Sequence, residues 1–493
     1  MKKNMKNNIW PIKKIELKPF LSMAILMFCI LFNLGILKSL KDSLIVPNIG
    51  AEAISFLKLY LVLPSAIIFT IIYVKLNNKF KIQNIFVIIV SVFVIIFLIF
   101  GYIIYPNYHH YHPSKSLIIE LQTSFPFMKW PIKIFSLWSF VIVYVAADLW
   151  SLIVISIMFW QFINHNVSTE QAKRMYPFLS MIGNTGLFVA GNFLIFCSSD
   201  NLFLKAVFFI FNNKDLTNEV IIIKLIVTAV ASFAIISMFL IHYSDFLMVS
   251  KIVNKKINPK PKLSVKKSFK LIIKSRYICN IALLVFCYNI AINITESCWK
   301  SKIKLMYPST KQYMEFMGYF NLWLGITSVL FTFISSYIIR NYSWKRAAMI
   351  SPMLIGIAGS LFFLSILLLS KINLNSNLII DPIIIAVFIG AIQNIISKSS
   401  KYSVFEVTKE MAYIPLTVEL KSKGKASVEV LGNKLGKSLG AILQTSIFTI
   451  MPNATFDSIS HILIFIFIIV IAIWFITIRK LDKQYNKLIF CNG

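Results

Sequence analysis

The chain has 493 residues, of which 58% are hydrophobic and 14% are charged, and its formal net charge is +31. Soluble globular proteins carry about 25% charged residues, so this composition excludes that class and favours a membrane protein. The six cysteines show no CxxC spacing, which argues against a disulfide framework and against a zinc site.

Twelve apolar segments are long enough to cross a bilayer, since a membrane-spanning helix needs about 20 residues. The predicted spans are 20–46, 57–74, 84–105, 134–163, 176–199, 220–243, 277–298, 313–338, 346–370, 378–397, 426–450 and 459–478. The basic first 18 residues lead into the first span without a small-residue cleavage site, so we expect a retained helix rather than a cleaved signal peptide. The predicted fold class is an all-α polytopic membrane protein.

Basic residues are distributed unevenly between the loops. If the N-terminus lies in the cytoplasm, the cytoplasmic segments hold 34 of the 50 Lys and Arg residues and the outer segments hold 13. The positive-inside rule favours this orientation, with both termini in the cytoplasm and the chain in the cell's plasma (inner) membrane. The positive charge therefore indicates membrane orientation rather than a nucleic-acid partner.

A basic stretch at 244–276 separates spans six and seven. Six helices, a long cytoplasmic linker and six more helices are typical of a major-facilitator-type transporter, whose two halves rock around a central site. We expect an N-terminal half at 1–243, the linker at 244–276 and a C-terminal half at 277–493.

Three histidines cluster in the outer loop 106–133, at His109, His110 and His112. No acidic residue or cysteine accompanies them with ligand spacing, so we expect a solvated loop and no metal site.

Charged residues near the end of the first span are unusual, because a charge in the bilayer core is costly and usually faces a functional cavity. Lys38 and Lys41 lie three residues apart on one helical face. Asp42 follows Lys38 by four residues, a spacing that permits a local ion pair. Extension of the lysines to the outer membrane surface is the alternative.

Two further acidic residues lie in or beside predicted spans. Asp148 has no Lys or Arg within one turn, so its partner must come from another helix; a structural ion pair and a gating or coupling role both stay open. Glu296 is spaced to pair with Lys300. Lys302 and Lys304 add positive charge at the same membrane face, and this surplus favours a bound polyanion over an outer-surface lysine cluster.

The eleventh span combines small residues with lysines. Gly432, Gly436 and Gly440 recur every four residues and form a stripe that lets another helix approach closely. Lys434 and Lys437 lie on an adjoining face. The string is not a Walker A loop, because Leu431 stands where that motif needs glycine and no strand precedes it.

The segment 398–425 mixes six lysines with three glutamates in an amphipathic pattern. We expect it to lie on the membrane surface, to form a cytoplasmic gate or to be a solvated surface helix.

Taken together, spans one, seven and eleven direct lysines toward the interior with few acidic residues against them. Lysine binds phosphate as a point charge, so the residues predict a transporter of polyanions, chiefly organic phosphates. Aromatic residues in or near these spans are available to stack on a base: Tyr144, Tyr288, Trp299 and Tyr307.

From about residue 20 to 480 the chain resembles the ATP/ADP translocases, the nucleotide transporters of obligate intracellular bacteria and plastids. The motifs that carry the resemblance are SLKDSLIV, GAEAISFLKL, FWQFINH, RMYPFLSMIGNTG, TESCWKSKIK, KYSVFEVTKEMAYIPL, ELKSKGKA and LGKS. The resemblance implies that Lys41, Asp148, Glu296 and Lys437 matter for transport. Members of the family differ in substrate: some exchange ATP for ADP, whereas others import a wider set of nucleotides.

Two positions depart from the family pattern. Residue 148 is commonly Glu, and Asp148 shortens the reach by one methylene; Leu439 replaces a glycine of the usual GKSGG.

The resemblance implies exchange of external ATP for internal ADP by alternating access. From the residues and the resemblance together we expect the substrate to be bound by Lys38, Lys41, Lys300, Lys302, Lys304, Lys434 and Lys437. Asp148 and Glu296 would pair with lysines in the empty site, and no cofactor or metal is expected. The alternatives are other nucleotides (GTP, CTP, UTP or NAD-like), proton-coupled uptake through Asp148 or Glu296, and a receptor without transport. An enzyme is not favoured, because no paired-carboxylate, Ser-His-Asp or metal constellation is present at these positions.

Overall fold

The computed structural model describes residues 12–167, 169–199, 218–249, 275–371, 381–416, 428 and 433–492. Within these ranges the regular structure is entirely helical. The N-terminal helices are α1 (Leu17–Ile45), α2 (Ala53–Phe56), α3 (Leu63–Asn77), α4 (Ile82–Ile99), α5 (Tyr108–Tyr111), α6 (Lys115–Ser124), α7 (Lys129–Ser136), α8 (Trp138–Trp150), α9 (Trp160–Asn166), α10 (Thr169–Ser198) and α12 (Asn218–Val249). The C-terminal helices are α14 (Arg276–Met306), α15 (Thr310–Asn341), α16 (Trp344–Lys371), α17 (Pro382–Ser400), α18 (Glu406–Ala412), α20 (Asn433–Ile450) and α21 (Ser460–Asn492).

Several α-helices continue into one another through short stretches of different winding. In the described ranges, four of these stretches are π-helical, at Leu57–Val62, Phe100–Ile104, Ser151–Phe159 and Lys401–Phe405. Three are 3₁₀-helical, at Lys14–Glu16, Tyr105–Asn107 and Pro126–Met128. Single-turn π-helical insertions occur often at functional sites.

In the described part of the chain, eleven helices are long and apolar enough to cross a membrane. A twelfth apolar helix, Ser438–Ile450 within α20, is shorter. The prediction of an all-α polytopic membrane protein with about twelve spans is therefore confirmed.

The prediction that a loop begins at residue 398 is wrong. The tenth span continues as helix from Pro382 to Ala412, through the π-helical stretch into α18. Ser399, Ser400 and Ser403 are each at most 4% exposed, so this polar run is packed inside the protein rather than solvated. Residues 417–425, the rest of the predicted segment, lie outside the described residues.

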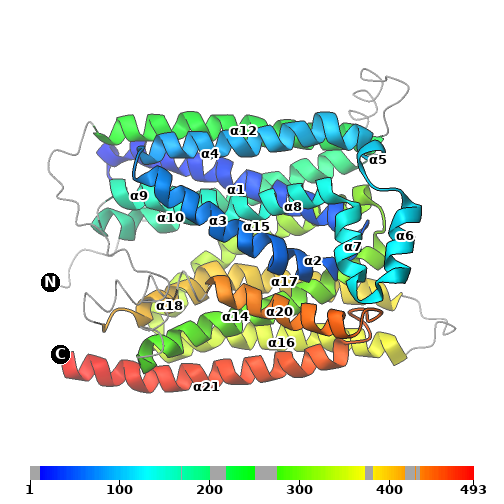
Figure 1. Cartoon of the computed structure of the whole chain (residues 1–493). Coiled ribbons are helices and arrows are strands. Elements are labelled where there is room, and N and C mark those ends of the chain that lie inside the picture. Colours follow the sequence, from blue (N-terminus) through cyan, green and yellow to red (C-terminus); the bar gives the residue numbers. More distant parts are fainter. Residues whose placement is uncertain are drawn as a thin grey trace.

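The long helices run side by side, and α1 begins at the same end of the bundle where α21 finishes (Figure 1). We call this the terminal end; α5, α6 and α7 lie at the opposite end, called here the outer end. Around α1 pack α8, α10 and α12, and around α14 pack α17, α20 and α21. The predicted division into two halves stays a prediction: α12 continues to Val249, and 250–274 lie outside the described residues.

A tight contact joins α10 to α15, across the N-terminal and C-terminal helices. A β-carbon added to Gly191 would lie 2.6 Å from the carbonyl oxygen of Gly318, and one added to Gly325 would lie 2.7 Å from the backbone nitrogen of Phe188. Only glycine fits at such a distance, so the two backbones approach as closely as helices can.

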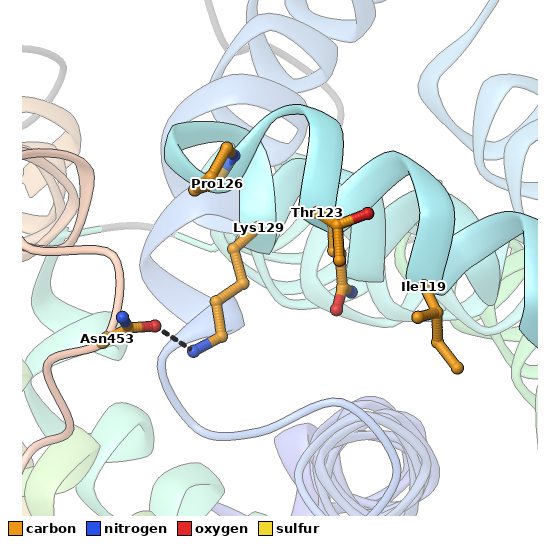
Figure 2. A pocket seen from close by; sticks show the side chains of 6 residues that line it. Ile119, Thr123, Pro126, Lys129 and Asn453 are labelled. Atoms are coloured by element: carbon orange, nitrogen blue, oxygen red, sulfur yellow. Dashed lines mark hydrogen bonds between the residues drawn. The ribbon is translucent and has the colours of Figure 1, made fainter.

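The outer end is closed by contacts between α7 and the C-terminal helices. The rings of Trp130 and Phe448 lie 6.2 Å apart. Lys129 donates a hydrogen bond of 3.2 Å to Asn453, at one side of a pocket of about 200 Å³ whose residues Figure 2 shows. The buried carboxylate of Glu52 accepts a hydrogen bond from the backbone nitrogen of Phe456.

Candidate functional site

Within the described part of the chain, Asp148 forms an ion pair with Lys41. The Lys41 ammonium nitrogen on α1 lies 2.5 Å from a carboxylate oxygen of Asp148 on α8, and 4.2 Å from the centre of the Tyr144 ring. The Lys41 side chain is only 6% exposed, so it does not extend to the membrane surface; that of Asp148 keeps 31% of its surface accessible. The sequence left two roles open for Asp148, a structural ion pair and a gating or coupling role. The structure shows the ion pair with another helix.

A second ion pair joins α1 to α14. The ammonium of Lys300 lies 2.8 Å from a carboxylate oxygen of Asp42, and both side chains are at most 4% exposed. The spacing permits Asp42 to pair with Lys38, but in the structure its partner is Lys300 instead. The Asp42 side chain faces α14, where the buried ammonium of Lys300 is its partner and water is excluded.

Glu296 lies between two lysines. Its carboxylate is 3.3 Å from Lys300, which confirms the predicted local pair, and 3.1 Å from Lys398 on α17. Lys398 was missed as a site residue because the hydropathy pattern placed it in a loop. The side chains of Glu296 and Lys398 are 20% and 19% exposed, so both remain accessible to water.

Lys38 and Lys58 complete this group of charges. Neither has a carboxylate within 4.0 Å among the residues that the structure describes, and both are partly exposed. Glu296 and Lys41 act electrostatically on both of them. Lys58 was missed because it lies at the edge of the second predicted span, where a lysine is unremarkable.

We call eight of these residues the charge cluster: Lys38, Lys41, Asp42, Lys58, Asp148, Glu296, Lys300 and Lys398. Five ammonium groups face three carboxylates, which leaves a surplus of two positive charges inside a membrane protein. Buried charges need compensation, because their removal from water costs several kcal/mol per ion. The cluster is therefore suited to an anion with more than one negative charge.

Other predicted binding residues lie elsewhere. The ammonium of Lys302 is 2.7 Å from Asp457, in the segment after α20. Lys304 has no carboxylate within 4.0 Å in the described ranges, and Glu52 acts on it electrostatically. The structure thus places Lys302 and Lys304 in the outer-end contacts rather than in the charge cluster.

The first turns of α20 carry Lys434 and Lys437, whose side chains lie outside the described part of the structure. The predicted small-residue stripe is confirmed at two positions: β-carbons added to Gly436 and Gly440 would each lie 3.0 Å from the Cβ of an asparagine on α14. Gly432 lies outside the described residues. The close approach to α14 brings the helix that carries these lysines beside the one that carries Glu296.

The aromatic residues considered for base stacking are largely part of the packing. Trp299 is fully buried and donates a hydrogen bond of 2.9 Å to the carbonyl of Val387. Tyr307 stacks on Phe316. Tyr288 stacks on Phe405, with an ammonium of Lys401 5.2 Å from the ring centre.

The histidine loop shows no metal-ligand arrangement. Within the described ranges no group of three His, Cys, Asp or Glu side chains is arranged to hold a metal ion. His112 instead shares a hydrogen bond of 2.8 Å with Ser139, and His109 and His110 are exposed.

Sequence comparison identifies the family. The sequence model described as "TLC ATP/ADP transporter" matches residues 1–485. The chain belongs to the TLC ATP/ADP transporter family. It is 48% identical to ADP,ATP carrier protein 3 of Rickettsia prowazekii (strain Madrid E) over 98% of both chains. It is 41% identical to ADP,ATP carrier protein 4 of Rickettsia bellii (strain RML369-C), over 97% of this chain and 92% of that one. The family indicated by the sequence motifs is therefore confirmed, and so is the prediction that the protein is a transporter rather than an enzyme.

The fold of the transporter is similar to that of solved membrane transporters. A bacterial homologue of the iron transporter ferroportin in the inward-facing state aligns with a TM-score of 0.56 at 11% identity, over 96% of this chain and 98% of that one. A POT family transporter in complex with 5-aminolevulinic acid gives 0.56 at 10% identity, over 96% of both chains. At such identities the likeness concerns the fold alone, and it confirms the major-facilitator-like arrangement.

Proposed function

We propose that this transporter exchanges ATP for ADP across the cell's plasma membrane by alternating access, with the charge cluster as the phosphate-binding site. The observation that carries the proposal is the surplus of positive charge, inside a bundle whose family and relatives are named for ATP and ADP. Nucleoside di- and triphosphates carry several negative charges, so either would compensate the cluster.

In the empty site, the carboxylates compensate three of the five lysines of the charge cluster by direct contact. Lys41 pairs with Asp148, and Lys300 pairs with both Asp42 and Glu296. A bound polyphosphate offers the same ammonium groups oxygen acceptors with greater charge. The ligand thereby releases the carboxylates, and this difference in contacts allows it to shift the protein between conformations.

The same electrostatics favours exchange over leak. If the bundle closes around the empty charge cluster, it encloses unbalanced positive charge. If it closes around a bound nucleotide, the phosphates compensate that charge. The empty transporter should therefore reorient slowly, and one nucleotide leaves only as another enters.

The proposed orientation places the terminal end in the cytoplasm. It rests on the excess of Lys and Arg in the segments that would then be cytoplasmic. The histidine-bearing loop and α6 would then face the outside. Lipid surrounds the bundle, and no nucleic-acid partner or cofactor is part of the proposal.

The decisive experiment measures uptake of radiolabelled ATP into vesicles containing the full chain, preloaded with ADP or left empty, with GTP, CTP and UTP as competitors. We expect uptake that depends on ADP loading and is abolished by Lys437→Ala. Transport of another nucleotide instead of ATP would retain the cluster's role and change the substrate, drawing attention to Asp148 and Leu439.

Proton-coupled uptake is the competing function, and the partial exposure of the Asp148 and Glu296 carboxylates is the observation that favours it. In that case uptake into empty vesicles would rise with an imposed pH gradient. Absence of transport for every nucleotide, with folded protein, would contradict both proposals.

A further inference from the structure

The segment between the third and fourth spans crosses the outer end of the bundle. The third span ends at Tyr111 and the fourth begins at Trp138, and α6 and α7 lie between them (Figure 1). Helix α7 packs against α2, and the 3₁₀-helical stretch Pro126–Met128 that precedes α7 reaches α20. A connection within the N-terminal helices therefore contacts a C-terminal helix.

Trp130 makes the apolar part of this contact. Among the residues of α7, all of which the structure describes, it alone is buried, with 6% of its surface exposed. A β-carbon added to Gly50 would lie 3.1 and 3.3 Å from two carbons of the indole ring, and the φ of +136° at Gly50 is one that L side chains rarely adopt. The ring of Phe448 on α20 lies 6.2 Å from that of Trp130. We call Gly50 and Phe448 the Trp130 seat, which joins a turn after α1 to a C-terminal helix.

Polar contacts accompany the seat. Lys129 donates a hydrogen bond of 3.2 Å to Asn453, the pair joined by a dashed line in Figure 2. The ammonium groups of Lys129 and Lys133 lie 5.8 and 5.2 Å from the centre of the Trp130 ring, within range of attraction to its face. Both lysines are partly exposed, so water can replace their contacts when the ring leaves the seat.

The seat leaves one group of the indole without a partner. Within the described part of the chain, the buried Trp130 Nε1 has no hydrogen-bond acceptor. A buried donor without an acceptor destabilises the arrangement that buries it, whereas outside the seat water would accept its hydrogen bond. Apolar contact thus favours the seated position and the missing hydrogen bond opposes it, a balance that suits a contact which opens and closes repeatedly.

We propose that α7 is a latch on the outer end, and that Trp130 leaves its seat whenever the transporter opens at that end. The inference rests on the proposed alternating access and adds the contact that controls entry. Because the seat joins N-terminal to C-terminal residues, the two sets of helices cannot separate at the outer end while Trp130 occupies it. The charge cluster binds the substrate in this account, and the latch sets how often the outer end admits one.

Cys298 on α14 is a natural reporter behind the latch. It is 2% exposed and shares a helical face with Lys302, four residues further along. The ammonium of Lys302 lies 2.7 Å from Asp457, among the outer-end contacts. Opening of the outer end should therefore expose the Cys298 thiol to water.

Cys279 on the same helix is an internal reference. It is exposed, and its neighbour Asn280 donates a hydrogen bond of 3.0 Å to Gln484 on α21, the helix that finishes at the terminal end. Its reaction with a thiol reagent should not depend on the latch.

Trp138 provides a matched control. It is a partly buried tryptophan at the start of α8, and its Nε1 donates a hydrogen bond of 3.0 Å to the carbonyl of Tyr111. Its ring centre lies 6.1 Å from that of His112. Both partners belong to the N-terminal helices, so removing Trp138 should loosen this region without emptying the Trp130 seat.

The test follows alkylation of Cys298 by a hydrophilic maleimide in the purified full chain, held in lipid nanodiscs without nucleotide and read by peptide mass spectrometry. In Trp130→Ala the rate at Cys298 relative to Cys279 should rise by about tenfold, because loss of a buried aromatic contact shifts the population toward the open form. In Trp138→Ala it should change by about twofold or less. Phe448→Leu, which removes the ring from the other side of the seat, should also raise the rate, and it replaces Trp130→Ala if that variant does not fold.

An unchanged rate in the folded seat variant would overturn the latch, and so would an equal rise in Trp138→Ala. Because the assay contains no nucleotide, its failure is distinguishable from failure of the proposed function. If alkylation responds to the seat but vesicles transport no nucleotide, the latch stands and the substrate assignment fails. If ATP exchanges for ADP but alkylation does not respond, the transport function stands and the latch is wrong.

Discussion

The contact between α10 and α15 and the contact between α1 and α14 both join N-terminal to C-terminal helices, and their composition is opposite. The first is lined by Gly191, Gly318 and Gly325, which leave no room between the backbones. The second is made by Asp42 and Lys300, two buried charges. The glycine contact depends on close packing, which a bound anion does not change. The buried ion pair is stable only while each charge has a partner, so a competing anion can disrupt it.

This difference suggests a division of roles. The glycine contact is suited to remain constant during transport, as an axis about which the helices turn. The charged contact is suited to open and close, because an anion can replace Asp42 beside Lys300. Each role can be tested separately by substitutions that affect one contact and spare the other.

The largest effect is expected at the glycine contact. In Gly191→Ala the new methyl group would lie 2.5 Å from the backbone nitrogen of Leu322, and backbone atoms have no alternative rotamer. We expect a loss of about 3 kcal/mol of stability, at the upper end of overpacking effects, measured by thermal unfolding of the purified transporter. Gly356→Ala is the control, because its methyl group meets only the movable side chain of Ile471 at 3.2 Å. Equal stability of the two variants would contradict the role of the glycine contact as a fixed axis.

A smaller loss of stability but a larger change in coupling is expected for Asp42→Asn. Lys300 retains Glu296, so the expected cost is about 2 kcal/mol rather than the full penalty of an unpaired buried charge. Because the ion pair between the two sets of helices is lost, uptake into empty vesicles should rise relative to ADP-loaded ones. Asp457→Asn removes the partner of Lys302 within the C-terminal helices and should leave that ratio unchanged. A ratio that is equally unchanged in Asp42→Asn would show that this pair does not enforce exchange.

The pair between Lys41 and Asp148 should contribute less to stability, because Asp148 is 31% exposed and partly screened. A double-mutant cycle with Lys41→Gln and Asp148→Asn should give a coupling of about 1 kcal/mol. Both single variants should nevertheless lose most of the transport. Full transport in either one, measured as initial uptake rate, would show that this pair is only structural.

The smallest effect concerns the outer end and depends on pH. Burial raises the pKa of Glu52 in the closed arrangement, against the opposing influence of Lys304 and Lys133. The closed form therefore binds a proton more tightly than an open form in which water reaches Glu52. Lowering the pH toward that raised pKa should favour closure and raise the KM for external ATP by about twofold. Glu52→Gln should show the raised KM at every pH; a pH dependence equal to that of the unmodified protein would exclude Glu52 as its source.

Much of the fold was predictable because segments that cross a bilayer must be helical and apolar, and such segments can be recognised from hydropathy along the sequence. The prediction failed where polar residues are buried, at Ser399, Ser400 and Ser403, since burial among neighbouring helices does not alter the local pattern. Lys41, Asp148 and Glu296 were predictable as site residues because a charge within an apolar segment needs a reason.

The pairings were less predictable. Asp42 has a lysine four residues before it, yet it pairs with Lys300, 258 positions along the chain, because helix packing decides which charges meet. Lys58 and Lys398 were not predicted as site residues, because lysines are common at the ends of apolar segments. Only the tertiary structure shows that both lie in the charge cluster.

The π-helical stretches have a consequence for how the transporter tolerates changes in chain length. Three of the four adjoin the charge cluster: Leu57–Val62 includes Lys58, Ser151–Phe159 follows Asp148 and Lys401–Phe405 follows Lys398. A π-turn holds one residue more than an α-turn, so deleting a single residue there restores ordinary helix and leaves the residues beyond it facing as before, whereas the same deletion in an α-helix rotates everything beyond it by about 100°. Deletions of one residue in these stretches should therefore be tolerated better than the same deletions in the α-helical parts of the same spans, which would turn the side chains beyond them to another face.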